Sequence, residues 1–202
     1  MRWPRRDTLI PLALGALAFV VALLQRPGLT VAETKVDLHV APQSFLRDVL
    51  SAWTPTGSLG HVFAGQYGGY LWPMGPFFAL GGLLDVPGWI VQRLWMALVL
   101  CVAFLGAVRV SRALGVRSDL ACILGGVAYA LSPRMLTVIG PSSVEVWPMA
   151  LVPWVLLPLV VGAERGSARR AAGLSALAIA TVGGVNAAAT SAVLPLGTHH
   201  EG

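Results

Sequence analysis

Residues 88–108 read GWIVQRLWMALVLCVAFLGAV and contain a single charged side chain, Arg93. A transmembrane helix needs about 20 predominantly apolar residues, so this stretch predicts a helix that crosses a membrane. The rest of the chain has the same character. Of its 202 residues, 56% are hydrophobic and 11% are charged, whereas soluble domains average about 25% charged residues. We therefore predict an all-α integral membrane protein, a multi-spanning helical bundle.

Four other stretches have the length and apolar character of spans. They cover residues 8–24, 120–136, 147–163 and 171–196. The first resembles a signal peptide, but Gln25-Arg26-Pro27 is not a small-residue cleavage site, so we expect an uncleaved span. Ser132-Pro133-Arg134 interrupts the second of these stretches. The last is rich in Ala, Gly and Ser, which favours close packing of helices.

The arginines lie in clusters between the apolar stretches, at residues 2–6, 109–117 and 165–170. The positive-inside rule assigns these clusters to the cytoplasmic side of a plasma membrane, with the amino terminus inside. The long loop 31–86 and the region of Glu145 then lie on the outer face. The net charge of +5 thus reflects topology. No basic patch is interleaved with aromatic residues, so we exclude nucleic acid as a partner.

Residues 42–53 of the outer loop have the pattern of an amphipathic helix. Its apolar residues recur at helical spacing: Phe45, Leu46, Val49, Leu50 and Trp53. Polar side chains occupy the other face, so we predict a helix that lies in the plane of the membrane surface.

Residues 54–76 are rich in glycine and aromatic residues. This composition suits a wall or lid over a cavity, and equally an aromatic belt at the membrane interface. Residues 75–84 are apolar but too short to span, which predicts a second interfacial or re-entrant helix. Asp85 and Pro87 then predict a capped start of the span 88–108.

The acidic residues on the predicted outer face are the candidates for catalysis. Apart from Glu33, they are Asp37, Asp48, Asp85 and Glu145. Asp48 belongs to the polar face of a helix and Asp85 to a helix start, so Asp37 and Glu145 remain. Transfer of a sugar to an alcohol needs a general base for the hydroxyl proton. One carboxylate suffices, because a lipid phosphate is a competent leaving group. Most loop aspartates are simply solvated, and that alternative stays open for Asp37.

Arg93 and Arg134 lie within or at the ends of apolar helices, near the predicted outer face. Such residues face a cavity or a partner, and these two suit bidentate binding of a phosphate. Snorkelling to lipid head groups is the equal alternative. Asn186 places an amide in the last apolar stretch, where it bonds either across helices or to a hydroxylated ligand.

Cys101 and Cys122 lie inside apolar stretches, and we predict packing roles for both. The histidines show no metal-ligand spacing with them, so no structural zinc site is predicted. The involvement of a divalent cation in the reaction is left open.

Several motifs occur in an order that resembles a known family. They are Asp37 in Val-Asp-Leu, residues 66–73 (QYGGYLWP), 92–95 (QRLW), 130–134 (ALSPR), 153–158 (PWVLLP) and 183–187 (GGVNA). Together they resemble the amino-terminal membrane domain of the actinobacterial alpha-(1→3)-arabinofuranosyltransferases of the AftD type, within the C-type glycosyltransferase (GT-C) superfamily.

The resemblance implies an inverting transfer from decaprenyl-phosphoryl-arabinofuranose to a growing arabinan of the cell envelope, in arabinogalactan or lipoarabinomannan. It also implies that the catalytic acidic residue of the first outer loop is Asp37, acting as the general base. We assign the remaining candidates to substrate binding: Arg93, Arg134, Glu145, Gln66, Tyr67, Asn186 and His39. Residues 1–197 then form the amino-terminal part of a GT-C domain, and 198–202 a short tail outside the family.

Family members continue through further helices and carbohydrate-binding β domains. We accordingly interpret the 202-residue chain as a fragment or an early-terminated reading frame rather than a complete small membrane protein. Two alternatives remain open at this point. One is a transporter or flippase for a lipid-linked sugar, suggested by the polar residues within helices. The other is a non-catalytic remnant.

Overall fold

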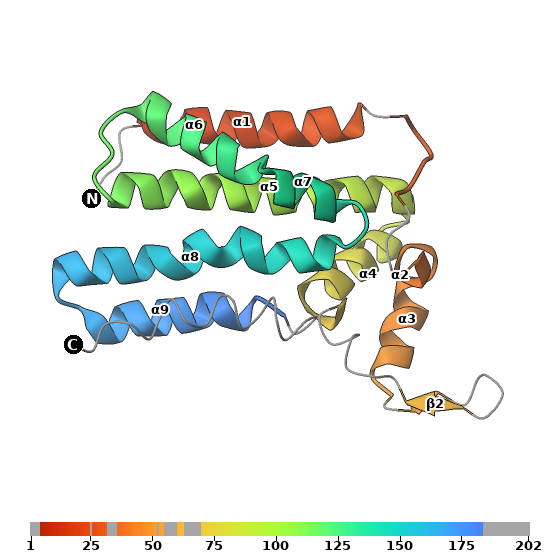
Figure 1. Cartoon of the computed structure of the whole chain (residues 1–202). Coiled ribbons are helices and arrows are strands. Elements are labelled where there is room, and N and C mark those ends of the chain that lie inside the picture. The colour runs from red at the N-terminus through yellow and green to blue at the C-terminus, as the bar shows by residue number, and fades with distance from the viewer. Residues whose placement is uncertain are drawn as a thin grey trace.

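The computed structural model describes residues 5–24, 26–31, 36–51, 53–54, 60–62 and 70–183. Long helices lie side by side, and three short helices gather at one end of them (Figure 1). The bundle consists of α1 (Arg5–Leu23), α5 (Gly88–Ala113), α6 (Asp119–Ala130), α7 (Pro133–Ile139), α8 (Ser143–Arg165) and α9 (Ala168–Ala180). The three short helices at its end are α2 (Val36–Val40), α3 (Pro42–Val49) and α4 (Gly75–Leu83), the last preceded by a kinked segment, η2 (Tyr70–Met74).

Helix α5 is the centre of the bundle, because it packs against α1, α6 and α8. Close approach to α8 depends on Gly106, where an added Cβ would lie 2.7 Å from Trp154 Nε1. That indole N–H donates a hydrogen bond to the carbonyl oxygen of Val102 at 2.9 Å. Small residues thus let two helix backbones approach, as is typical of helix pairs in membranes.

Among the described residues, α5 and α8 are long and apolar enough to cross a membrane. Helices α6 and α7 form a third candidate span, bent by 42° at a break. The break lies where the sequence predicts an interruption, with Pro133 in the first turn of α7. Proline has no N–H to continue the hydrogen-bond ladder of the preceding helix.

Helix α5 continues to Ala113, five residues past its predicted end at 108. Arg109 and Arg112, which the sequence analysis assigned to the following loop, therefore belong to the last turns of α5. The guanidinium of Arg109 lies 4.6 Å from the centre of the Trp154 ring, and Arg112 pairs with Asp119 at 2.8 Å. Both arginines have partners within the bundle, so the helix continues through them.

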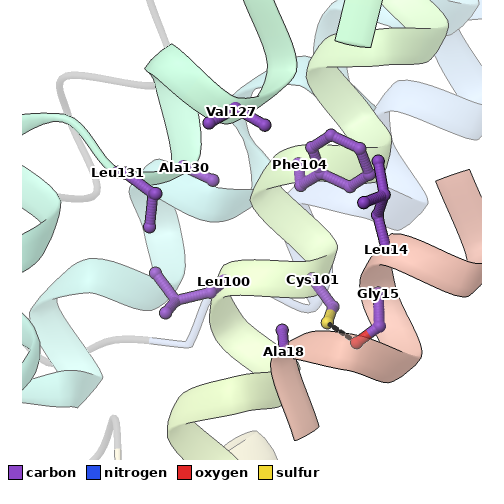
Figure 2. A pocket seen from close by; sticks show the side chains of 9 residues that line it. All are labelled: Leu14, Gly15, Ala18, Leu100, Cys101, Phe104, Val127, Ala130 and Leu131. Atoms are coloured by element: carbon purple, nitrogen blue, oxygen red, sulfur yellow. Dashed lines mark hydrogen bonds between the residues drawn. The ribbon is translucent and has the colours of Figure 1, made fainter. Parts of the chain in front are cut away.

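Helix α1 packs on α5 beside an apolar pocket of about 160 Å³ between α1, α5 and α6 (Figure 2). The thiol of Cys101 points across it and donates to the carbonyl oxygen of Gly15 at 3.2 Å. Cys101 and Cys122 are both free and buried, which confirms the packing role predicted for them.

The predicted helix 42–53 is shorter than expected. Helix α3 ends at Val49, and Trp53 lies in a two-residue strand, β1 (Trp53–Thr54), which pairs antiparallel with β2 (His61–Val62). Phe45 is buried, but Leu50 is 77% exposed. The prediction that the helix extends to Trp53 was therefore wrong, because α3 ends at Val49.

Asp85 was expected to start α5, and this too was wrong. The residue preceding the first turn of α5 is Pro87, whereas Asp85 closes the carboxyl end of α4 with φ +53°. The N–H of Asp85 bonds to the Gly82 carbonyl at 3.3 Å, and that of Val86 to the Gly81 carbonyl at 3.0 Å. These two bonds define a Schellman motif, in which the left-handed position is usually glycine.

We predict that Gly106→Ala lowers the stability of the bundle by about 1–3 kcal/mol, since the new methyl group meets the Trp154 ring. The matched control is Gly173→Ala on α9, where an added Cβ has no atom within 4 Å. This control should leave stability unchanged or raise it by up to about 1 kcal/mol. Thermal unfolding in detergent checks both, and an equal response of the two variants would contradict the packing described.

Candidate functional site

The short helices form a platform against the first turns of α5 (Figure 1). Its interior is apolar, with Leu38 fully buried and Phe45 and Phe78 nearly so. Glycines make the close packing possible. A Cβ at Gly88 would lie 2.8 Å from the carbonyl oxygen of His39. Helix α2 is therefore seated directly on the start of α5.

A buried glutamine ties the segment after α1 to α5, the helix on which this platform packs. Gln92, only 1% exposed, accepts a hydrogen bond from the N–H of Val31 at 2.8 Å and donates one to its carbonyl oxygen at 2.9 Å. The side-chain amide thus pairs with the backbone of Val31 as a neighbouring strand would. This contact holds Val31, at the end of the described segment 26–31, against α5.

Arg93 strengthens the same connection. Its guanidinium donates hydrogen bonds to the carbonyl oxygens of Arg26 and Leu29 and lies 4.7 Å from the centre of the Trp89 ring. The sequence predicted either phosphate binding or snorkelling to lipid head groups for Arg93. It did not predict these contacts with the protein's own backbone and with Trp89. Charged groups that bond to backbone carbonyls are a known solution for arginine at membrane depth. Binding of substrate by Arg93 stays a prediction.

Asp37 lies in the first turn of α2 and is exposed. The next residue, Leu38, is fully buried and fixes the helix to the core. The carboxylate is therefore presented on an anchored helix rather than on a free loop. An exposed carboxylate in this setting has room for an alcohol to approach it.

A second surface of α2 borders a mostly polar cavity of about 290 Å³. His39 lines it, with its ring edge-on to Phe78 at a centroid distance of 4.7 Å. Gln43 of α3 and Asp85 of the α4–α5 turn also line it. Asp37 does not. Sequence reasoning missed Gln43 and Asp85 because each had a sufficient local explanation as a helix residue.

Glu145 and Arg134 lie on the neighbouring helices. Glu145 is half-buried in the first turn of α8, and Arg134 is exposed in the first turn of α7. Beneath the start of α8, Trp95 of α5 donates to Ser143 Oγ at 2.9 Å and packs against Trp147 with centroids 5.4 Å apart. Gln66, Tyr67 and Asn186, also predicted to bind substrate, lie outside the described residues.

The chain is similar to known proteins over most of its length. A family model for the amino-terminal GT-C domain of alpha-(1→3)-arabinofuranosyltransferase matches residues 17–198. The alpha-(1→3)-arabinofuranosyltransferases of Mycobacterium tuberculosis and Mycolicibacterium smegmatis are 45% and 46% identical to it, over 88% and 87% of this chain. The matched regions span 13% and 12% of those relatives.

Solved structures show the same similarity. A cryo-EM structure of the arabinofuranosyltransferase AftD from mycobacteria superposes with a TM-score of 0.85 at 41% identity, covering 98% of this chain and 15% of that one. A mutant of the same enzyme gives a TM-score of 0.87 at 42% identity, with 97% and 15% covered.

We predict that Gln92→Ala destabilises the segment 26–31 by about 2 kcal/mol or more, because it removes two hydrogen bonds and leaves backbone groups of Val31 without them. Amide hydrogen exchange at Val31 should accelerate by roughly 30-fold, the equivalent of 2 kcal/mol. Ser51→Ala is the control, since it removes one bond between exposed groups. Unchanged exchange at Val31 would exclude this anchoring role for Gln92.

Proposed function

The chain belongs to the alpha-(1→3)-arabinofuranosyltransferase family, as its amino-terminal GT-C domain, and on this premise we propose that it serves the transfer of arabinofuranose from a decaprenyl-phosphate donor to cell-envelope arabinan. The observation that carries the proposal is the family match over residues 17–198, with 45% identity to a relative of that name. The geometry of the α2 platform supports it, because the carboxylate that the reaction needs is exposed there.

In the proposed reaction, an acceptor hydroxyl attacks the anomeric carbon of the donor arabinofuranose. The bond between that carbon and the phosphate oxygen breaks, and the departing decaprenyl phosphate keeps the electron pair. The hydroxyl proton passes to the carboxylate of Asp37, which acts as general base. Attack opposite the leaving group inverts the anomeric configuration.

Among the described acidic residues of the platform and of the turn that follows it, Asp37 suits this role best. Asp48 is exposed on the polar face of α3, and Asp85 closes α4 in a left-handed conformation. Asp37 is exposed beside a fully buried residue on a helix seated against α5. For the donor phosphate, Arg134 is the stronger candidate, since it is exposed whereas Arg93 is buried against backbone carbonyls.

We further propose that α1, α5, the bent pair α6–α7 and α8 span the plasma membrane, with the α2–α4 platform outside. The start of α1, the α5–α6 turn and the α8–α9 turn share the opposite end of the bundle (Figure 1). Arginines gather in these segments, which is the pattern of a cytoplasmic side.

We predict that Asp37→Asn abolishes transfer. The variant is made in a chimera in which residues 17–198 replace the matched region of the Mycolicibacterium smegmatis relative, and transfer from decaprenyl-phosphoryl-arabinofuranose is measured in membranes. The rate should fall by about 100-fold or more, since general-base catalysis contributes roughly 10²–10⁴-fold. Asp48→Asn, on the same platform, should retain activity. Full activity of the Asp37→Asn chimera would overturn this assignment.

The membrane orientation predicts the labelling of single cysteines. Cys101 and Cys122 are buried and give little background. A membrane-impermeant maleimide should label Ser51→Cys in intact cells, and should label Ala168→Cys only after permeabilisation, because both positions are exposed but at opposite ends. The reverse pattern would overturn the orientation.

A further inference from the structure

The polar cavity beside α2 brings together hydrogen-bonding side chains from three separate elements. His39 comes from α2, Gln43 from α3 and Asp85 from the turn between α4 and α5. These elements meet where the platform joins the bundle (Figure 1). Residues distant in sequence thus converge on one space of about 290 Å³, which is near the small end of ligand pockets.

Two glycines form part of the wall of this cavity. A Cβ at Gly82 would lie 2.7 Å from Gln43 Nε2, and one at Gly88 would lie 2.8 Å from the His39 carbonyl oxygen. Larger residues there would displace the polar groups that line the space. The glycines therefore keep these groups in place while the helices pack closely.

Asp85 is an unusual residue for its backbone conformation. It occupies the left-handed position that closes α4, where glycine costs least. Aspartate tolerates this conformation better than most residues but gains nothing from it over glycine. Asp85 lines the cavity, so a role there gives a reason for an aspartate at this position that the helix end does not.

The chemistry of the lining favours a neutral, hydroxylated ligand. Carboxylate and carboxamide groups bind sugar hydroxyls well, and Phe78, Val86 and Val91 supply an apolar wall for C–H groups. A phosphate would be repelled by Asp85. A metal ion lacks ligands, since no group of three or more His, Cys, Asp or Glu among the described residues suits one.

We propose that this cavity binds one arabinofuranose residue of the acceptor chain, away from the reacting hydroxyl. The inference rests on the proposed function. His39 follows Asp37 by two positions, which places the two side chains about 200° apart around α2. The bound residue therefore lies across the helix from the base. Binding of such a remote unit selects longer acceptors without taking part in bond formation.

Asp85→Gly is the decisive variant in the chimera described above, because glycine retains the helix end and removes only the carboxylate. Thermal stability should be unchanged or slightly higher. The KM for a synthetic arabinofuranose oligosaccharide acceptor should rise by about tenfold, the loss expected for one charged hydrogen bond. The kcat should stay near that of the unsubstituted chimera, and so should the KM for a single-residue octyl arabinofuranoside. Gln43→Leu should show the same selective rise, and Asp48→Asn should not.

The outcomes separate this inference from the function on which it rests. If the unsubstituted chimera transfers no arabinose, the proposed function fails. If it transfers normally but Asp85→Gly leaves the KM for the oligosaccharide unchanged, the cavity is not an acceptor subsite. An equal rise in KM for both acceptors would also overturn the inference, because it would place the cavity at the reacting residue.

Discussion

The hydrogen bonds between Gln92 and Val31 hold the segment that follows α1 against the first turns of α5, on which the α2–α4 platform also packs. In a protein of this composition, a buried amide must find its partners inside the chain, since lipid offers none. The two hydrogen bonds of Gln92 meet that demand and also hold Val31, in the segment after α1, against α5. Arg93 bonds to the carbonyls of the same segment. One turn of α5 thus holds the segment 26–31 in place.

The α2–α4 platform is held on α5 by close packing of apolar and small residues rather than by charged groups. Gly88 lets α2 rest on α5, and Leu38 fills the space beneath it. The exposed carboxylate of Asp37 and the polar cavity of His39, Gln43 and Asp85 then occupy different sides of one short helix. In the proposed enzyme, these are the places of proton transfer and of acceptor recognition.

Local signals in the sequence predicted the elements well, because each depends on a few adjacent residues. Pro133 marked the break between α6 and α7, and the apolar run 88–108 marked α5. The errors arose where distant contacts decide. Arg109 extends α5 because Trp154 lies beside it, and Asp85 closes α4 because the chain turns back there into α5. The helical spacing of apolar residues also predicted that the helix beginning at Pro42 continues to Trp53, whereas α3 ends at Val49.

By itself, the sequence determined the helical membrane character, since that depends only on the number of apolar residues in a row and the rarity of charges between them. It also singled out Asp37, from its position after the first span and from its motif. Only the tertiary structure decided what Arg93 contacts and which polar residues share a cavity. Such contacts join residues up to 67 positions apart, such as Arg93 and Arg26. No periodicity along the chain records that distance, because it arises from how α1, α4 and α5 pack together.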